Sequence, residues 1–226
     1  MVAGQIAQLP KDSKVLELGA GSSDLENIVK KNFKRSDIKF TKIDGDKTYE
    51  FDDLMEINIY DITTEACKNF VKRTGPYDAV VFMEVVEHID YDRDVDFIFE
   101  YVYDSLKKEG MLFVTTPTPP YEGFYEDRVW PQDHKREFTL SKIYDIINKR
   151  FKINKQIGWS LEEREYNQLL ESDETIMKIY TKLKGAFPES YIRAIIASIS
   201  PTQANRQVLL ICKGRREIVN GRFTQT

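Results

Sequence analysis

A short apolar run that ends in a glycine turn constrains the fold of this chain more than any other feature. The run covers residues 15–18, and Gly19 and Gly21 follow it directly. Glycine permits a tight turn and lets backbone N–H groups come close to a ligand. Ser23 and Glu26 have the spacing of a capping box, which would start a helix right after the turn. The segment therefore predicts a buried strand, a glycine turn and a helix.

Predicted strands and helices alternate along the chain. Apolar runs predict strands at residues 15–18, 38–44, 57–61, 77–83, 111–115, 151–157 and 207–212. Apolar residues at helical spacing mark helices between them, and the first helix presents Leu25, Ile28, Val29 and Phe33. The run at 77–83 is continuous, as in strands that are buried on both faces of a parallel sheet. The alternation predicts an α/β fold with a doubly wound, seven-stranded, mostly parallel sheet.

Polar residues and glycines indicate where several of these helices begin and end. Thr63 or Thr64 can cap the helix that follows the strand at 57–61, because a hydroxyl accepts a bond from a backbone N–H at a helix start. The Lys-Lys-Glu-Gly stretch at 107–110 has the composition of a helix end. Thr139 can cap the helix before the strand at 151–157. We therefore expect a helix to run up to residues 107–110.

An insertion at residues 160–206 separates the last two predicted strands. It begins with an acidic segment, and two helices are expected in it, the second begun by Pro188 and stopped before Pro201. One interpretation is a set of packing helices with a solvated face. The other is a lid or acceptor platform, because loops at one edge of such sheets carry specificity. The two interpretations are compatible.

Length and charge fit a single enzyme domain over residues 1–226. Of the 226 residues, 41% are hydrophobic, which is enough to fill a core. The net charge is −4, and the charged residues, 31% of the chain, are mixed along it. This mixture argues against a strongly electrostatic binder of nucleic acid or of an anionic membrane. Residues 214–226 are expected to form a flexible tail.

Two cysteines, Cys67 and Cys212, lie in a predicted helix and a predicted strand. We expect buried thiols there, not a disulfide or a metal pair. No stretch of the sequence is apolar enough to span a bilayer, and the N-terminus lacks a basic segment followed by an apolar one. These features predict a cytoplasmic protein.

Two motifs resemble those of a known enzyme family. Glu17 stands two residues before Gly19, and the resulting E-x-G-x-G pattern resembles motif I of class I S-adenosylmethionine-dependent methyltransferases. The run E-V-V-E-H-I at residues 84–89 resembles motif IV of the broad group that includes ubiquinone-biosynthesis O-methyltransferases. The likeness covers residues 12–158 and 207–213. It implies a Rossmann-like methyltransferase fold whose last two strands form a hairpin-like edge.

The resemblance implies S-adenosylmethionine as the cofactor. Gly19, Ala20 and Gly21 would wrap its methionine end. The carboxylate of Glu17 would order the glycine loop and meet the methionine ammonium, directly or through water. A nicotinamide cofactor fits less well, because Ser23 stands where its fingerprint needs a third glycine.

The ribose and the adenine of the cofactor have their own expected partners. Asp44, at the end of the second strand, takes the place of the acid that binds ribose hydroxyls in dinucleotide-binding folds. Asp46 is a rival for this role, since both acids flank the same glycine, and the strand end favours Asp44. By resemblance, Asp61 with Ile62 would contact the adenine, and Asp61 would accept from its amino group.

The motif IV run offers two different interpretations. By resemblance, Met83 and Glu84 supply wall and backbone contacts near the methionyl part of the cofactor. Glu84, Glu87 and His88 are spaced i, i+3 and i+4, so a helical turn would put all three on one face. Together with His134 they could hold a divalent cation. This set resembles magnesium-dependent small-RNA 3′-terminal 2′-O-methyltransferases, but metal-free relatives carry the same run, and we rank the metal-free interpretation first.

Methyl transfer requires alignment, desolvation and the removal of one proton from the acceptor. A histidine suits an oxygen acceptor, and the chain has only His88 and His134. His134 follows the long loop after the fifth predicted strand and is our first choice as general base; His88 is the second. The loop at 116–130 is rich in proline and aromatic residues and would form a stiff acceptor wall.

The sequence therefore predicts a methyltransferase that acts on an oxygen, with nitrogen as second choice, of a small molecule or glycan. Two alternatives stay open. A magnesium-dependent RNA 2′-O-methyltransferase would need a basic groove, and the sequence shows no dense stripe of lysine and arginine. A non-catalytic S-adenosylmethionine-binding domain would lack an acceptor pocket.

Overall fold

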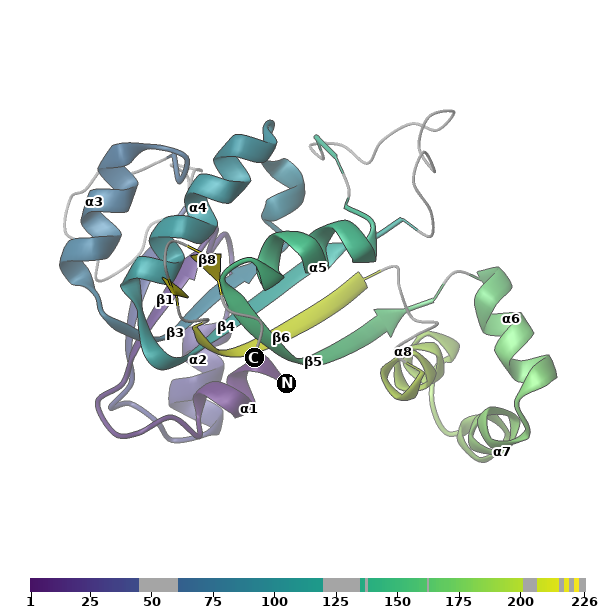
Figure 1. The fold of residues 1–226 in the computed structure, drawn as a ribbon. Helices are drawn as coiled ribbons and strands as arrows, with labels where there is room; N and C mark the ends of the chain where they lie inside the picture. Colours follow the sequence, from purple (N-terminus) through teal and green to yellow (C-terminus); the bar gives the residue numbers. More distant parts are fainter. Residues whose placement is uncertain are drawn as a thin grey trace.

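A six-stranded sheet organises the molecule (Figure 1). The computed structural model describes residues 1–44, 61–119, 135–136, 138–161, 163–200, 207–215, 218–219 and 222–223. The strand order is β2-β1-β3-β4-β6-β5. Neighbouring strands from β2 to β4 are parallel, whereas β6 is antiparallel to both β4 and β5. The strands are β1 (Lys14–Leu18), β2 (Lys39–Ile43), β3 (Tyr77–Met83), β4 (Leu106–Pro117), β5 (Phe151–Ser160) and β6 (Gln207–Arg215).

This architecture confirms the predicted α/β fold with a mostly parallel sheet and an antiparallel edge. A seven-stranded sheet is not confirmed: residues 57–60 of the third predicted strand lie outside the described residues, and Asp61, its expected last residue, is not in a strand. The other predicted strands all form, and β3 has the predicted bounds, 77–83.

Helices cover both faces of the sheet, as a doubly wound fold requires. In Figure 1, α3, α4 and α5 lie on one face and α1 and α2 on the other. The bounds are α1 (Val2–Ile6), α2 (Leu25–Asn27), α3 (Glu65–Thr74), α4 (Asp92–Ser105) and α5 (Leu140–Asn148). Thr64 and Thr139 cap α3 and α5, as expected. The sequence did not predict α1, which has five residues.

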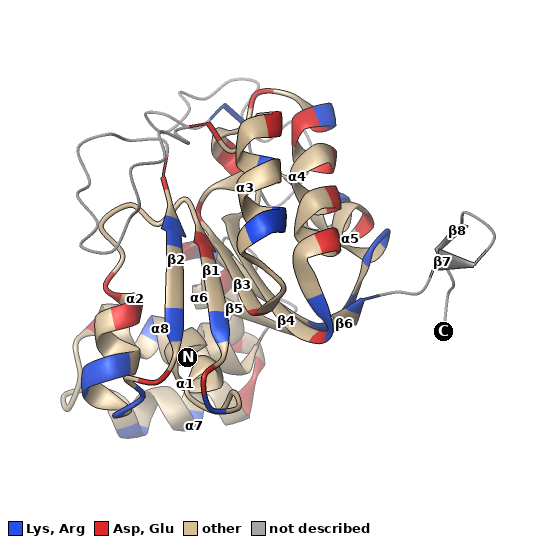
Figure 2. Cartoon of the chain, turned by 90° about the vertical axis from the view of Figure 1, so that its left-hand side faces the viewer, with Lys and Arg blue, Asp and Glu red and all other residues tan. Residues whose placement is uncertain are grey.

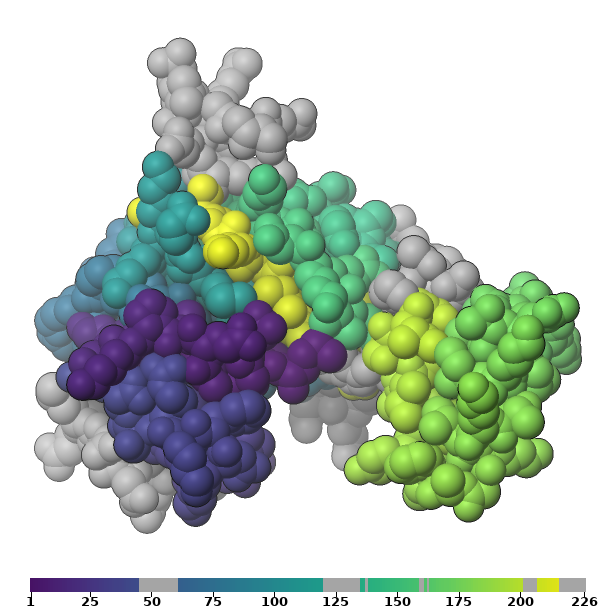
Figure 3. All heavy atoms as spheres, turned by 90° about the horizontal axis from the view of Figure 1, so that it is seen from below, coloured from purple at the N-terminus to yellow at the C-terminus, as the bar shows by residue number. Residues whose placement is uncertain are grey.

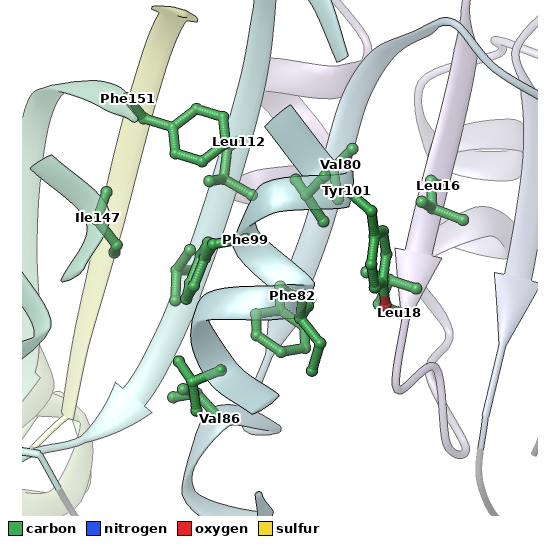
Figure 4. Close-up of a cluster of buried hydrophobic side chains, with 14 of the residues drawn as sticks. Leu16, Leu18, Val80, Phe82, Val86, Phe99, Tyr101, Leu112, Ile147 and Phe151 are labelled. Carbon is green, nitrogen blue, oxygen red and sulfur yellow. The ribbon is translucent and has the colours of Figure 1, made fainter. Parts of the chain in front are cut away.

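The sheet separates two hydrophobic clusters because successive residues of a strand point to opposite faces. Leu16, Val80 and Phe82 pack against α3, α4 and α5, while Val15 and Val81 pack against α1 and α2. Figure 4 shows the first cluster, in which Phe82 meets Phe99 of α4 edge to face, with ring centroids 5.8 Å apart. This packing holds α4 firmly against the middle of the sheet.

The turn after β1 leads into a shorter α-helix than the sequence predicts. The capping box does not form: Ser23 Oγ accepts from Leu25 N–H, and Glu26 pairs instead with Lys30 at 2.6 Å and Lys42 at 3.2 Å. A π-helix, η1 (Ile28–Asn32), continues α2. Since a π-helix has a wider turn, the 3.6-residue periodicity is lost. Ile28 and Phe33 are consequently exposed, although we expected them on the inner face.

The helix α4 ends two residues before the stretch at 107–110 that we expected to end it. Ser105 Oγ donates to the carbonyls of Tyr101 and Val102, and the strand β4 begins at the next residue. The pairing register of β3 and β4 shifts there, which indicates a bulge. A Cβ on Gly110 would lie 2.7 Å from Leu106 Cγ. Gly110 therefore serves a close approach inside a strand and does not terminate a helix.

The insertion between β5 and β6 contains three helices in its described residues, one more than predicted. They are α6 (Glu163–Ser172), α7 (Glu174–Leu183) and α8 (Glu189–Ile199). The acidic segment is thus largely helical, which fits a solvated helix face. Leu161, Tyr166, Leu169, Ile192 and Ile196 belong to a hydrophobic cluster separate from the two beside the sheet. Seen from below, these helices lie apart from α1 and α2 (Figure 3).

A groove on this lower side lies between α1 and the strands β5 and β6. It has a volume of about 610 Å³, and Met1, Leu9, Lys155, Ile157 and Lys213 are among its lining residues. None of the predicted site residues lines it. The groove is therefore separate from the site at the other end of the strands.

The described residues of the C-terminal segment lie in strands. Gly214 and Arg215 belong to β6, so the sheet extends into the expected flexible tail. Beyond it, β7 (Ile218–Val219) pairs antiparallel with β8 (Arg222–Phe223). Within the described residues, no helix has the length and apolar character needed to cross a membrane.

Candidate functional site

The glycine loop after β1 is held by the end of β2. The N–H groups of Gly19 and Ala20 donate to the carbonyl of Ile43 at 2.8 and 3.1 Å. The N–H of Gly21 donates to Asp44 Oδ2 at 2.6 Å. Gly19 and Gly21 have φ angles of 68° and 47°, a left-handed conformation that glycine adopts without a steric penalty. Two neighbouring parallel strands therefore fix the loop at the carboxyl edge of the sheet.

The two glycines have different neighbours. A Cβ built on Gly19 would lie 2.3 Å from Cγ2 of Val85, so no side chain fits there. At Gly21 the nearest atom to such a Cβ is Asp44 Oδ2 at 3.9 Å. Gly19 thus allows the loop to touch the segment after β3, and Gly21 leaves room for a ligand to approach the backbone.

A buried carboxylate lies behind this loop. Glu17 is 2% exposed, and its Oε2 atom has no hydrogen-bond partner in the described part of the chain. Burial is the main cause that raises the pKa of Glu17, while a hydrogen bond from Ser23 and the charge of Lys42 act against it. An acceptor without a partner is costly inside a protein. A cationic donor, such as the ammonium of a methionine, fits this position.

We expect Glu17→Gln to separate stability from cofactor affinity. Because the pKa of Glu17 is raised, the unfolded chain ionises first as the pH increases above 4.5. The free energy of unfolding therefore falls as the pH rises from that value to the raised pKa of the folded state. This loss, which is due to Glu17 alone, remains at neutral pH. The variant avoids this loss, so its thermal midpoint at pH 7.5 should equal or exceed that of the wild type.

The same variant should bind the demethylated cofactor S-adenosylhomocysteine about tenfold more weakly, since a hydrogen bond between charged groups is lost. Thermal melts with and without this ligand measure both effects. A variant that melts lower without ligand and binds as tightly as the wild type would contradict the role of Glu17.

Asp44 lies at the end of β2, as predicted. Its Oδ2 atom accepts from Gly21, so the carboxylate supports the glycine loop as well as facing the edge where a ribose is expected. The rival Asp46 lies outside the described residues. The ribose role of Asp44 stays a prediction.

Asp61 begins a tight turn before α3. Its Oδ1 atom accepts from the N–H and the hydroxyl of Thr63 at 2.8 and 2.6 Å, and its carbonyl accepts from the Thr64 hydroxyl at 2.7 Å. No hydrogen bond to Oδ2 is found among the described residues, and Asp61 is exposed. We expect this oxygen to accept from an adenine amino group, and the contact itself stays a prediction.

Met83 ends β3, and Glu84 directly follows it in a left-handed conformation with φ of 52°. Such a conformation is uncommon outside glycine and is often found at functional sites. The backbone N–H of Glu84 donates to both the carbonyl and the hydroxyl of Thr115, each at 3.0 Å. Glu84 Oε2 accepts from Gln207 Nε2 at 3.4 Å. The side chain of Glu84 therefore reaches toward β6, away from the glycine loop on β1.

The expected common face of Glu84, Glu87 and His88 does not form, because Glu84 is not helical. The other two lie in a 3₁₀-helix, η2 (Val86–His88). Glu87 is fully buried and accepts from Thr116 Oγ1 at 3.2 Å, whereas His88 is exposed. In the part of the chain that the structure describes, no three His, Cys, Asp or Glu side chains form a group that could hold a metal. His134 lies outside that part.

The segment after His134 is anchored to η2. The N–H groups of Lys135 and Arg136 donate to the carbonyl of Glu87 at 2.9 and 3.2 Å, and Arg136 forms an ion pair with Asp92 of α4. This connection brings the start of α5 to the carboxyl end of β3.

Sequence reasoning missed two residues that shape the site: Val85, against Gly19, and Thr115, which holds Glu84. Val85 belongs to the motif that we had identified, but its role appears only when β1 and β3 lie side by side. Thr115 and Thr116 are adjacent near the end of β4, and the sequence gives no signal that distinguishes Thr115 from a core threonine. Both cysteines are buried thiols, as predicted, and burial raises the pKa of Cys212 to about 12.

Comparison with known proteins gives one family and a set of similar structures. The family described as a methyltransferase domain matches residues 3–172, which includes every predicted cofactor residue. The sequence matches none of the curated proteins. The match ends at the last residue of α6, Ser172, so α7, α8 and β6 lie beyond it.

Three solved structures illustrate the structural likeness. Coclaurine N-methyltransferase bound to N-methylheliamine and S-adenosylhomocysteine gives a TM-score of 0.53 at 14% identity, over 94% of this chain and 70% of that chain. A methyltransferase from Archaeoglobus fulgidus gives 0.53 at 17%, over 94% and 92%. A small RNA methyltransferase gives 0.55 at 13%, over 94% and 24%. At identities this low, the structural likeness shows the common fold alone.

Proposed function

The chain belongs to the methyltransferase-domain family, whose cofactor is S-adenosylmethionine, and from this premise we propose that it methylates an oxygen atom of a small molecule or glycan. One observation carries the cofactor assignment to this chain: a glycine loop backed by a buried carboxylate, one oxygen of which has no hydrogen-bond partner among the described residues. A ligand can approach the backbone at Gly21, and the carboxylate of Glu17 can accept a hydrogen bond from a cationic donor. These features suit the methionine end of the cofactor.

When bound, the cofactor supplies an electrophilic methyl group on a sulfonium. The protein has three tasks: to hold the cofactor, to align the acceptor, and to accept one proton from it. We propose that Glu17 and the glycine loop bind the methionine end. Asp44 would bind the ribose, and Asp61 with Ile62 would bind the adenine. Met83 and the backbone of Glu84 complete the wall beside the methionyl part.

We propose His134 as the general base that accepts the proton of the acceptor. A neutral imidazole can take the proton of a hydroxyl as the methyl group moves. The bond from Lys135 N–H to Glu87 O supports this choice, because it ties the residue next to His134 to the carboxyl edge of β3. His88 is the second choice, and its exposed position makes it less able to work in a water-poor pocket.

We assign the acceptor platform to the insertion between β5 and β6. Pro117 of β4 and Ser160 of β5 both pair with Gln207, so the insertion leaves and rejoins the sheet at the carboxyl edge of β4. Gln207 also contacts Glu84. The root of the insertion therefore lies next to the site, which supports its role as a lid or platform.

A second candidate is a magnesium-dependent RNA 2′-O-methyltransferase. The E-x-x-E-H run and the fold likeness to a small RNA methyltransferase favour it. Two observations favour the small-molecule assignment instead. Glu84, Glu87 and His88 do not share a face. The helix α4 is mainly acidic and carries a single basic residue, Arg93 (Figure 2). RNA binding of this kind relies on basic surfaces.

Methyl-labelled cofactor, incubated with metabolite extracts and with small RNA, distinguishes the two candidates. We expect label in an alkali-stable, low-molecular-weight product, at a rate that a chelator leaves unchanged. Label in RNA, or activity that a chelator abolishes and magnesium restores, would reverse the ranking.

A further inference from the structure

Ile62, the residue after Asp61, is held from the core side by Tyr101, which is distant in sequence. Tyr101 of α4 is fully buried, and its hydroxyl donates to the carbonyl of Ile62 at 2.9 Å. The Sγ atom of Cys67, on α3, lies 3.9 Å from the same hydroxyl oxygen. The ring of Tyr101 is fixed as well, because the ring of Phe97 packs against it edge to face, with ring centroids 5.6 Å apart. The hydroxyl therefore has a defined position under the turn at residues 61–64.

The phenol hydroxyl is not needed for filling the core. A phenylalanine at position 101 would bury the same ring, and burying a hydroxyl is unfavourable unless it forms a hydrogen bond. Its strong bond is the one to Ile62, since the contact with the thiol of Cys67 is long and weak. Burial also raises the pKa of Tyr101 well above its ordinary value, so the hydroxyl stays protonated and remains a donor.

The turn at residues 61–64 is fixed from two directions. From its own side, Thr63 holds Oδ1 of Asp61, and Thr64 holds the Asp61 carbonyl while it caps α3 through Cys67 N–H. From the core side, Tyr101 holds Ile62. The bonds to Oδ1 and the carbonyl orient the carboxylate, and the bond to Ile62 sets its distance from the sheet edge. Asp61 is exposed, and no hydrogen bond to its Oδ2 atom is found among the described residues.

We propose that Tyr101 is a positioning residue for adenine recognition: its hydroxyl fixes Ile62 so that Asp61 Oδ2 meets the exocyclic amino group. This proposal rests on the proposed function, since it needs the adenine at this turn. Tyr101 itself is fully buried, so we assign it no direct contact with the cofactor. Its effect reaches the ligand through the backbone of one residue.

The test compares two ligands that differ at the adenine amino group. S-adenosylhomocysteine carries the amino group, and S-inosylhomocysteine has a carbonyl oxygen there. The wild type should prefer the adenine ligand, because Asp61 accepts from the amino group but not from the carbonyl. In Tyr101→Phe, affinity for the adenine ligand should fall by about fivefold, as expected for one neutral hydrogen bond, and the preference should shrink by a similar factor. The KM for S-adenosylmethionine should rise while kcat is retained.

Tyr144→Phe is the matched control. Its hydroxyl donates to Gln156 Oε1 at 2.7 Å, between α5 and β5, away from the turn at residues 61–64. This variant loses a comparable bond, so its thermal midpoint should fall about as far as that of Tyr101→Phe, yet its ligand preference should equal that of the wild type. An unchanged preference in Tyr101→Phe would overturn the role of Tyr101 while leaving the proposed function intact. A wild type that binds S-adenosylhomocysteine without the preference would overturn the adenine role of Asp61 and, with it, that of Tyr101. A wild type without affinity for S-adenosylhomocysteine would overturn the proposed function as well.

Discussion

Replacing Gly19 by alanine should lower the affinity for S-adenosylhomocysteine by about 100-fold, or roughly 2.7 kcal/mol. The new methyl group would lie 2.3 Å from Val85 Cγ2, and alanine disfavours the φ of 68°. The loop must move away from the segment after β3, and its N–H groups move with it. Isothermal titration of the variant measures the loss, and circular dichroism checks that the fold is retained.

Gly185→Ala is the matched control for backbone strain. Gly185 has a φ of 90° and lies in the insertion, where a Cβ would meet no atom within 4 Å. This variant carries a similar strain without a clash, and we expect wild-type affinity for the ligand. If Gly19→Ala binds as tightly as Gly185→Ala, the glycine loop is not the binding site of the methionine end.

Replacing His134 by asparagine should slow turnover by roughly 100-fold while leaving cofactor affinity unchanged. Asparagine keeps a polar side chain but cannot take the acceptor proton. The wild-type rate should fall as the pH drops through the range in which a histidine is protonated, and the variant should lose this dependence. Single-turnover rates over a pH series, together with titration of the cofactor product, separate chemistry from binding.

His88→Asn is the comparison for this experiment, since His88 is the other histidine of the chain. It is exposed on η2, and we expect nearly wild-type turnover. A slow His88→Asn beside a fast His134→Asn would transfer the role of base to His88. Two fast variants would mean that alignment alone accounts for the rate.

The fold follows from the sequence where tertiary contacts reinforce the local pattern. The run at 79–83 is apolar throughout because β3 lies between two parallel strands and under helices on both faces, so pattern and environment agree. The pattern fails at Ile28 and Phe33, because a π-helix replaces the expected α-helix and shifts the buried face. It fails again at Gly110, where the same residue that would end a helix makes a bulge possible.

The candidate site shows a similar limit. Glu17, Gly19 and Gly21 are recognisable because they lie close together in the sequence. Their spacing along the chain determines how they lie in the loop. Val85 and Tyr101 are not, because each acts on a partner that is distant in sequence, Gly19 in one case and Ile62 in the other. Only the neighbouring strands and helices bring these pairs together.

Isothermal titration of the wild-type chain with S-adenosylhomocysteine, followed by NADH, tests the central claim most directly. The claim is that the glycine loop and the buried carboxylate of Glu17 form a site for S-adenosylmethionine. We predict a dissociation constant in the micromolar range for S-adenosylhomocysteine and no measurable heat with NADH. Binding of NADH without binding of S-adenosylhomocysteine would contradict the claim.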